Sequence, residues 1–281
     1  MPQDIDLSYA IGLTPEKAVE YFKSKGYTFS WNWYDTWQEA HSIAFTVAKA
    51  ARLDVLQDIR LELQRALDDG ETLAEFRRNL EPMLKAKGWW GEKILGGGEL
   101  APETARLGSP WRLELIYRQN MQTAYNAGRW QQQMENEDDR PYLQYVAVMD
   151  SRTRRSHAAM NGLVFRADDP VWNTFYPPNG FGCRCSVRAL SERNIQERGL
   201  TVSSSEGKLS AREVLVSGST GEIVPVTVLR FRNSTTGEIV EMAPDPGFNY
   251  NPGRAAWQPD LSKYPDDLRK AYEDYMRAKG P

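Results

Sequence analysis

Cysteine and histidine are scarce in this chain, with two of each among 281 residues. The two cysteines, Cys183 and Cys185, are separated by a single residue, and a disulfide across so short a span would be strained. This scarcity excludes a small secreted domain held together by disulfides and favours a reducing cytoplasm. The soft ligands of any reactive or metal-binding centre must come from this small set.

Long apolar runs and an excess of one charge are also absent. No uninterrupted apolar stretch is long enough to span a membrane, and residues 1–7 are polar and acidic, unlike a secretion signal. The 35 basic and 38 acidic side chains give a net charge of −3, which excludes a global positive field that would draw the chain onto DNA or an anionic membrane. We therefore expect a soluble protein, not secreted, in which any contact with nucleic acid is local.

The chain does have ample material for a hydrophobic core. Hydrophobic residues make up 41% and aromatic residues 11% of it, enough for one large or two modest domains. The predicted fold class is α+β, with a helical N-terminal region (1–90), a compact central α/β core (109–199) and a β-rich C-terminal extension with a terminal helix (200–281). The glycine-rich run at 91–98 lacks the Gly-Lys-Ser/Thr ending of a phosphate-binding loop and is predicted to be a linker or surface loop.

Capping residues and hydrophobic spacing predict three helices before residue 90. The first covers about 14–26, and apolar residues at four-residue spacing predict a long second helix from about 35 to 70. Thr72 and Glu75 form a capping box before the third, which Pro82 should kink or restart.

The second half of the chain mixes one long helix with short strands. Ser109 and Pro110 should start the helix, which continues into the polar run at 131–139. The pentapeptide Thr-Gly-Glu-Ile-Val occurs at 220–224 and again at 236–240, which indicates two turn-then-strand units. The remaining predictions are strands at 142–149, 163–165, 186–187, 213–216, 222–232 and 238–242, an irregular loop at 245–253, and a last helix around 264–275.

Three soft or borderline metal ligands, His157, Cys183 and Cys185, lie in one central stretch, and Asp150 could supply a fourth. Zinc is the ion that this set favours. The alternative is that the cysteines pack as small apolar groups and His157 makes an ordinary hydrogen bond. A catalytic interpretation would make His157 a general base oriented by Asp150, with Cys183 as nucleophile or Arg154 as an oxyanion stabiliser, but nothing in the spacing requires it.

The same stretch is rich in arginine and contains no lysine. Between residues 150 and 198 there are five acidic residues and eight arginines, at positions 152, 154, 155, 166, 184, 188, 193 and 198. Arginine without lysine favours fixed, planar pairing with carboxylate or phosphate groups. We predict that Arg152, Arg155 and Arg184 pair internally with nearby aspartates such as Asp150, or with backbone carbonyls, and hold the loops together. The alternatives are a local nucleic-acid contact and a subunit interface.

An ordered set of motifs runs through this part of the chain. It comprises Arg118, Thr123 and Gly128-Arg129 on a helix, a strand ending in Asp150, and then Arg152-Thr153-Arg154, His157, Gly162, Trp172, Pro177-Pro178 and Cys183-Arg184-Cys185. The set resembles the tailed-phage minor head proteins typified by the Mu F protein, also called phage head morphogenesis proteins. The resemblance extends over about residues 10–200 and is weak beyond them.

The resemblance implies a structural virion component and no enzymatic activity. Such a protein acts in prohead assembly, in the host cytoplasm and then in the head of the virion, by binding the portal protein and the major capsid protein. DNA and further copies of the chain are additional implied partners, and a membrane is not. The residues expected to serve structure or interaction are Arg118, Thr123, Arg129, Asp150, Arg152, Thr153 and Arg184.

The sequence departs from some members of that family at two positions. Arg154 stands where those relatives have a cysteine, and Gly180 where they have a histidine. This leaves His157, Cys183 and Cys185, with Asp150, as the largest ligand set for zinc. The alternative function from another class is a metal-dependent or cysteine-based phage-borne enzyme, a nuclease or effector, acting through Asp150, His157 and Cys183.

Overall fold

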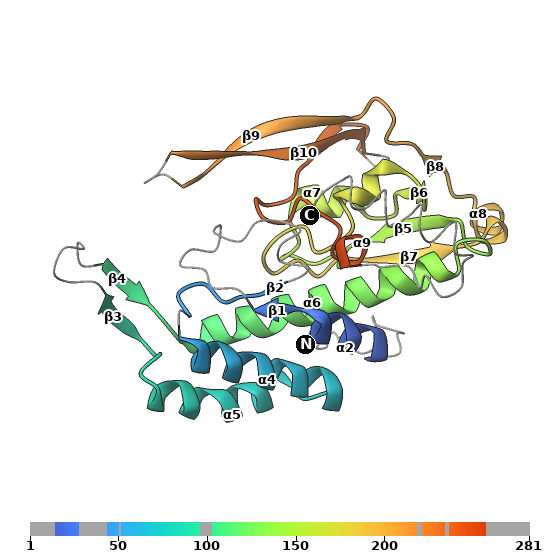
Figure 1. Cartoon of the computed structure of the whole chain (residues 1–281). Helices are drawn as coiled ribbons and strands as arrows, with labels where there is room; N and C mark the ends of the chain where they lie inside the picture. The colour runs from blue at the N-terminus through green and yellow to red at the C-terminus, as the bar shows by residue number, and fades with distance from the viewer. Residues whose placement is uncertain are drawn as a thin grey trace, which may run out of the picture.

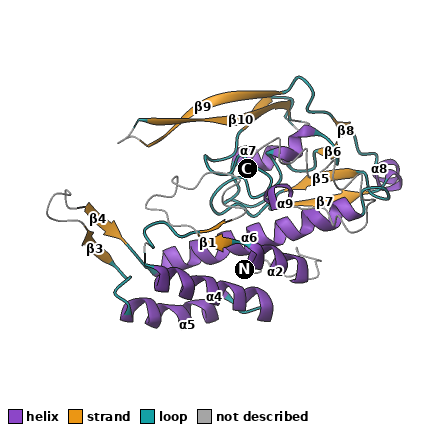
Figure 2. Cartoon of the chain, viewed as in Figure 1, coloured by secondary structure: helices purple, strands orange, loops and turns teal. Residues whose placement is uncertain are grey.

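The long helix α6 (Pro110–Glu135) organises the computed structural model, which describes residues 15–27, 44–50, 52–95, 103–217, 221–233 and 236–256. Figure 1 shows α6 crossing the middle of the molecule, with a layer of helices on one side and the central sheet on the other. The helical layer consists of α2 (Pro15–Ser24), α4 (Leu53–Asp69) and α5 (Leu73–Ala86). The predicted mixed α+β class is confirmed (Figure 2).

Helix α6 contributes to two hydrophobic cores. It begins as predicted, because the Ser109 hydroxyl accepts a hydrogen bond from the Arg112 backbone N–H at 3.2 Å and Pro110 occupies the first turn. Its residues from Leu113 to Ala127 pack with the N-terminal helices, and Trp130 packs into the second core. Between them lies Gly128, where an added Cβ would be 2.9 Å from the Ala18 backbone nitrogen. Glycine therefore allows α2 and α6 to approach closely.

The predicted apolar stripe of α4 and the predicted capping box of α5 are confirmed. In α4, Val55, Ile59, Leu63 and Leu67 are buried, and the helix ends at Gly70 in the left-handed conformation. Helix α5 starts with the complete capping box formed by residues 72 and 75.

Pro82 was predicted to kink or restart its helix; the restart is wrong, because α5 continues without a break to Ala86, and the kink stays a prediction. Proline removes the hydrogen bond to the carbonyl four residues earlier, that of Arg78. Both Pro82 and Arg78 are exposed, so water can satisfy that carbonyl.

The prediction of one helix over residues 35–70 is wrong for residues 44–50 and for residue 52. Ala44–Phe45 form the short strand β2, which pairs in parallel with β1 (Gly26–Tyr27), and a turn with Lys49 at φ 61° follows. Helix α4 starts only at Leu53. Residues 35–43, which include His41, lie outside the described residues.

The prediction of a loop over the glycine-rich run at 91–98 is wrong for residues 92–95. Strands β3 (Glu92–Leu95) and β4 (Glu103–Arg106) pair in antiparallel fashion, so residues 92–95 belong to a hairpin that protrudes from the body (Figure 1). Residues 96–102, between the strands, lie outside the described residues.

The central sheet contains the three strands that were predicted, with boundaries that differ slightly. Its order is β7-β5-β6-β8, with β5 antiparallel to β7 and β6, and β6 parallel to β8. The first predicted strand ends at residue 146 rather than 149. The strands are β5 (Tyr142–Val146), β6 (Val164–Arg166), β7 (Ser186–Leu190) and β8 (Val202–Ser203). Short helices α7 (Arg155–Met160) and α8 (Glu192–Arg198) and the 3₁₀ turn η1 (Pro170–Asn173) connect them.

The C-terminal strands form a three-stranded antiparallel sheet, and the strands β10 and β11 follow the two turns that the repeated pentapeptide indicated. Its order is β11-β10-β9, and the turns contain Gly221 and Gly237 at positive φ. The strands are β9 (Leu209–Ser217), β10 (Glu222–Arg232) and β11 (Ile239–Met242). Leu229, Phe231 and Met242 enter the second core, so this sheet shares its core with the central sheet.

The last described element is α9 (Pro252–Ala256), which packs against α6. It replaces the end of the irregular loop predicted for residues 245–253. At Gly253 an added Cβ would lie 2.4 Å from the Cβ of Trp130, so the two helices touch through a glycine. The helix expected around 264–275 lies outside the described residues, and the domain boundaries at 90, 109 and 199 stay predictions.

No helix among the described residues is both long and apolar enough to span a membrane.

Candidate functional site

The Cys-Arg-Cys sequence enters β7 in an extended conformation that sorts its side chains by alternation. Cys183 and Cys185 are buried, whereas Arg184 between them is partly exposed. Side chains two residues apart in extended backbone point to the same face. The two sulfurs therefore face the core together, and Arg184 faces the opposite way.

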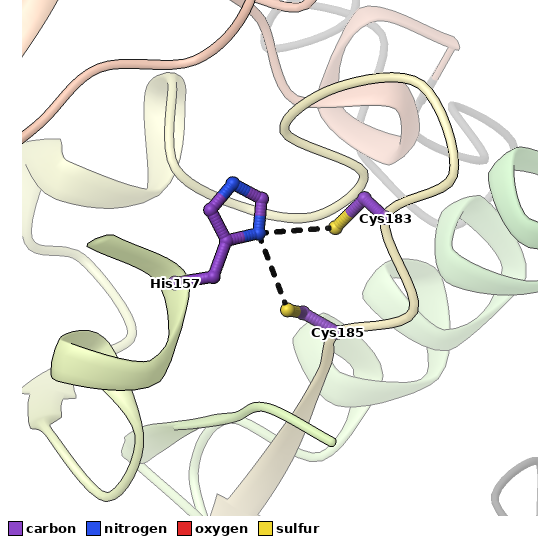
Figure 3. Close-up of side chains that lie close together, drawn as sticks. All are labelled: His157, Cys183 and Cys185. Carbon is purple, nitrogen blue, oxygen red and sulfur yellow. Dashed lines mark hydrogen bonds between the residues drawn. The ribbon is translucent and has the colours of Figure 1, made fainter. Parts of the chain in front are cut away.

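His157 meets both sulfurs from helix α7. Figure 3 shows its ring facing both cysteines, with Nδ1 3.7 Å from Cys183 Sγ and 3.6 Å from Cys185 Sγ. The ligand atoms of the three residues lie within 4.8 Å of one another. The side chains are 3%, 8% and 2% exposed for His157, Cys183 and Cys185, so the cluster is sealed from bulk solvent.

The two thiols have different proton affinities. A hydrogen bond from Cys185, reinforced by His157, lowers the pKa of the Cys183 thiol well below its usual value. The pKa of the Cys185 thiol is raised, chiefly because of its hydrogen bond with Cys183 and also because the side chain is buried. Both cysteines are free rather than joined in a disulfide.

Asp150 fastens the loop after β5 instead of joining the cluster. Its carboxylate binds the Arg184 guanidinium in a two-pronged pair, with N···O distances of 2.7 and 2.5 Å. The Arg152 backbone N–H also donates to it at 3.0 Å, and the Thr153 hydroxyl at 3.2 Å. The hydrogen bonds from Arg184, followed by that from Arg152, hold the pKa of Asp150 well below its usual range.

The internal pairing predicted for the arginines is present at Arg184, and more weakly at Arg152, whose Nη2 lies 3.7 Å from the Asp150 carboxylate. Arg155 is exposed at the first residue of α7. Three other arginines pair with carboxylates: Arg154 with Asp245, Arg166 with Asp168 and Arg193 with Glu197.

Arg154 and Gly180, the two positions that depart from the family pattern, lie against each other. An added Cβ at Gly180 would be 2.3 Å from Arg154 Nη1 and 2.3 Å from Asp245 Oδ2. Arg154 pairs with Asp245 at 2.9 Å and donates to the Phe181 carbonyl at 3.2 Å. In this chain Arg154 therefore forms an ion pair with the C-terminal segment, and the lack of a side chain at Gly180 leaves room for that pair.

The three α6 residues predicted for structure or interaction lie outside the cluster. Arg118 is exposed and pairs with Glu114 one turn earlier at 2.8 Å. Thr123 is buried and accepts a hydrogen bond from Gln119 at 3.3 Å. Arg129 is partly buried, and desolvation lowers the pKa of its guanidinium.

A row of side-chain amides on α6 was not predicted from the sequence, and these amides donate hydrogen bonds to backbone carbonyls at and just before β7. Gln122 and Asn126 donate to the Cys185 carbonyl at 2.8 and 3.4 Å, and Gln133 donates to the Val187 carbonyl at 2.9 Å. Their spacing of four and seven residues places them on one helix face. Polar residues at that spacing on a helix rich in apolar residues were the feature that could have revealed them.

Sequence reasoning also missed Asn179, which is fully buried beside the cluster. Its side-chain oxygen accepts from the Tyr145 hydroxyl at 3.0 Å, and its side-chain nitrogen donates to the Thr174 carbonyl at 3.3 Å. Its own carbonyl accepts from the Asp245 backbone N–H at 3.0 Å. Through its side chain and its backbone carbonyl, Asn179 thus connects β5, the turn before the cysteines and the C-terminal segment.

Residues 57–188 match the family model described as "Phage Mu protein F like protein". This match and the two similarities described next show that most of the chain resembles Mu F-like proteins.

Two relatives are similar over most of the chain. One is "Putative capsid assembly protein F" of Escherichia phage Mu, 50% identical over 263 residues, which are 92% of this chain and 59% of the relative. The other is "Mu-like prophage FluMu F protein" of Haemophilus influenzae, 48% identical over 236 residues, which are 83% of this chain and 55% of the relative. This chain therefore spans less than two thirds of the length of either.

A third relative is more distant. "Uncharacterized protein MJ0329" of Methanocaldococcus jannaschii is 31% identical over 105 residues, which are 36% of this chain and 16% of that protein. No solved structure matches the chain.

Proposed function

We propose that this chain is a structural component of a tailed-phage or prophage head, acts in head morphogenesis, and binds the portal protein and the major capsid protein. The observation that carries the proposal is the 50% identity, over 92% of the chain, to a relative named for capsid assembly. Its places of action are the host cytoplasm during assembly and the head of the virion.

Two protruding hairpins supply surfaces suited to binding other head proteins. The β9–β10 hairpin extends beyond the central sheet, and its cross-strand neighbours Leu215 and Ile223 are 57% and 55% exposed. Ile94 on the β3–β4 hairpin is 74% exposed. Apolar side chains exposed on protruding strands favour burial against a partner.

The burial of the reactive side chains supports a structural role over the enzyme alternative. His157 and Cys183 are at most 8% exposed. Asp150, the third residue of the catalytic hypothesis, is paired with Arg184. A general base must lie within reach of the substrate proton that it abstracts. A nucleic acid or protein substrate could reach this cluster only if the surrounding loops moved.

DNA is a weaker candidate partner than the head proteins. The net charge of −3 supplies no global attraction, so binding would depend on local arginines. Affinity that is carried by phosphate contacts falls steeply as the salt concentration rises.

Affinity capture from cells that assemble heads tests the proposal. The tagged chain should retain portal or major capsid protein, identified by mass spectrometry. The double variant Leu215→Ser/Ile223→Ser should retain less of them, whereas Glu213→Ser, on an exposed position of the same strand, should retain the wild-type amount. Capture of neither head protein by the wild-type chain would contradict the proposal.

A further inference from the structure

We propose that His157, Cys183 and Cys185 bind a zinc ion, which joins helix α7 to the start of strand β7. The site goes beyond a role in head assembly and stands independently of it. Three observations carry the proposal: the distances between the ligand atoms, the hydrogen-bonding capacity of the histidine ring, and the charge balance of a buried site.

The distances match those around a tetrahedral zinc ion. With Zn–N bonds of about 2.0–2.1 Å and Zn–S bonds of about 2.3 Å, the nitrogen and each sulfur should lie about 3.6 Å apart. The observed distances from His157 Nδ1 are 3.7 Å to Cys183 Sγ and 3.6 Å to Cys185 Sγ. The side chains thus require little rearrangement to bind the ion.

The hydrogen bond between the two cysteines does not explain why both sulfurs approach one ring nitrogen of His157. A histidine ring nitrogen carries either one in-plane lone pair or one hydrogen, so it forms one good bond with one sulfur. Here two sulfurs approach the same Nδ1 atom at nearly equal distances. An ion in the middle gives all three atoms a partner at once.

The charges also balance. A zinc ion bound by two thiolates and a neutral imidazole carries no net charge, which suits a cluster that is at most 8% exposed. Thiolate and imidazole ligands together are typical of zinc.

The ligands are held in place before any ion arrives. The Cys183 backbone N–H donates to the Gly180 carbonyl at 3.1 Å, which forms the turn before the first sulfur. The Cys185 carbonyl accepts from Gln122 and Asn126 of α6. Such hydrogen bonds behind the ligands orient them and strengthen metal binding.

The fourth coordination position falls to a water molecule. Among the described residues, no other histidine, cysteine, aspartate or glutamate belongs to this group. Asp150, the fourth ligand expected from the sequence, is engaged by Arg184 with N···O distances of 2.7 and 2.5 Å.

Metal analysis of the wild-type full chain, expressed with zinc and purified without chelator, tests the site and does not depend on any variant folding. One equivalent of zinc is expected. X-ray absorption at the zinc edge should show two sulfur neighbours at about 2.3 Å and two nitrogen or oxygen neighbours at about 2.0 Å. A chain that is folded by circular dichroism, contains no zinc and takes up neither zinc nor cobalt would overturn the proposal. So would bound zinc without sulfur neighbours.

Substitutions then identify the ligands. Cys183→Ser, Cys185→Ser and His157→Ala should each reduce bound zinc at least tenfold, whereas Ser156→Ala, beside the histidine on α7, should retain one equivalent. Asp150→Asn should also retain it. Zinc retained by all three ligand variants, or lost from folded Asp150→Asn protein, would contradict this ligand set.

Discussion

Replacing Gln133 by methionine should break the main polar connection between α6 and the central sheet. The Gln133 side chain is buried, its nitrogen donates to the Val187 carbonyl at 2.9 Å, and its oxygen accepts from the Tyr176 hydroxyl at 2.8 Å. Methionine has a similar volume but replaces neither bond. Both partners are buried in the second core, so the hydroxyl loses its acceptor and the Val187 carbonyl loses this donor.

The expected cost follows from these two groups. A buried polar group deprived of its partner costs about 1–3 kcal/mol, so the two together should lower the free energy of unfolding by about 2–6 kcal/mol. Urea denaturation followed by circular dichroism measures this value. Gln131→Met on the same helix, where the side chain is only partly buried, is the matched control and should change stability by less than about 0.5 kcal/mol. A loss below about 0.5 kcal/mol at Gln133 would refute the proposed connection.

Three further predictions concern a cap, a helix contact and an ion pair. Thr72→Ala should lower the free energy of unfolding by about 1 kcal/mol because it removes the capping box of α5, and an unchanged denaturation midpoint would contradict that role. Gly253→Ala should cost about 1–3 kcal/mol, since the new Cβ would collide with Trp130, and a neutral result would show that α9 does not pack this closely. Because the pKa of Asp150 is lowered in the folded state, its carboxylate stabilises the protein above its ordinary pKa and this contribution is lost as the pH falls towards the lowered value. The melting-temperature difference between wild type and Asp150→Asn should therefore shrink between pH about 5 and pH about 2, and a constant difference would contradict the Arg184 pairing.

Local sequence patterns predicted those elements whose ends depend on local chemistry. The capping box at Thr72, the Ser109-Pro110 start of α6 and the apolar stripe of α4 are each defined within a few residues. The strand at 44–45 was missed because it depends on pairing with Gly26–Tyr27, about eighteen residues earlier. The residues at 44–45 are compatible with a helix, so only the pairing with the other strand determines that they form a strand.

The candidate site was predictable in composition and only in part in geometry. Alternation along an extended chain places both cysteines on one face and Arg184 on the other. The same alternation explains why Asp150, which pairs with Arg184, lies apart from the sulfurs. The approach of His157 depends on the position of α7 relative to β7, a contact across 26 residues that no local pattern specifies.

Mass spectrometry of purified proheads and virions is the most direct test of the central claim, that this chain is a structural component of a phage head. A phage or induced prophage that encodes the chain supplies both particles, and particles from a deletion of the gene serve as the control. We expect peptides of the chain in proheads at fewer copies than the major capsid protein, and fewer normal heads in the deletion strain. Absence of the chain from both particles, together with normal head assembly in the deletion strain, would contradict the claim.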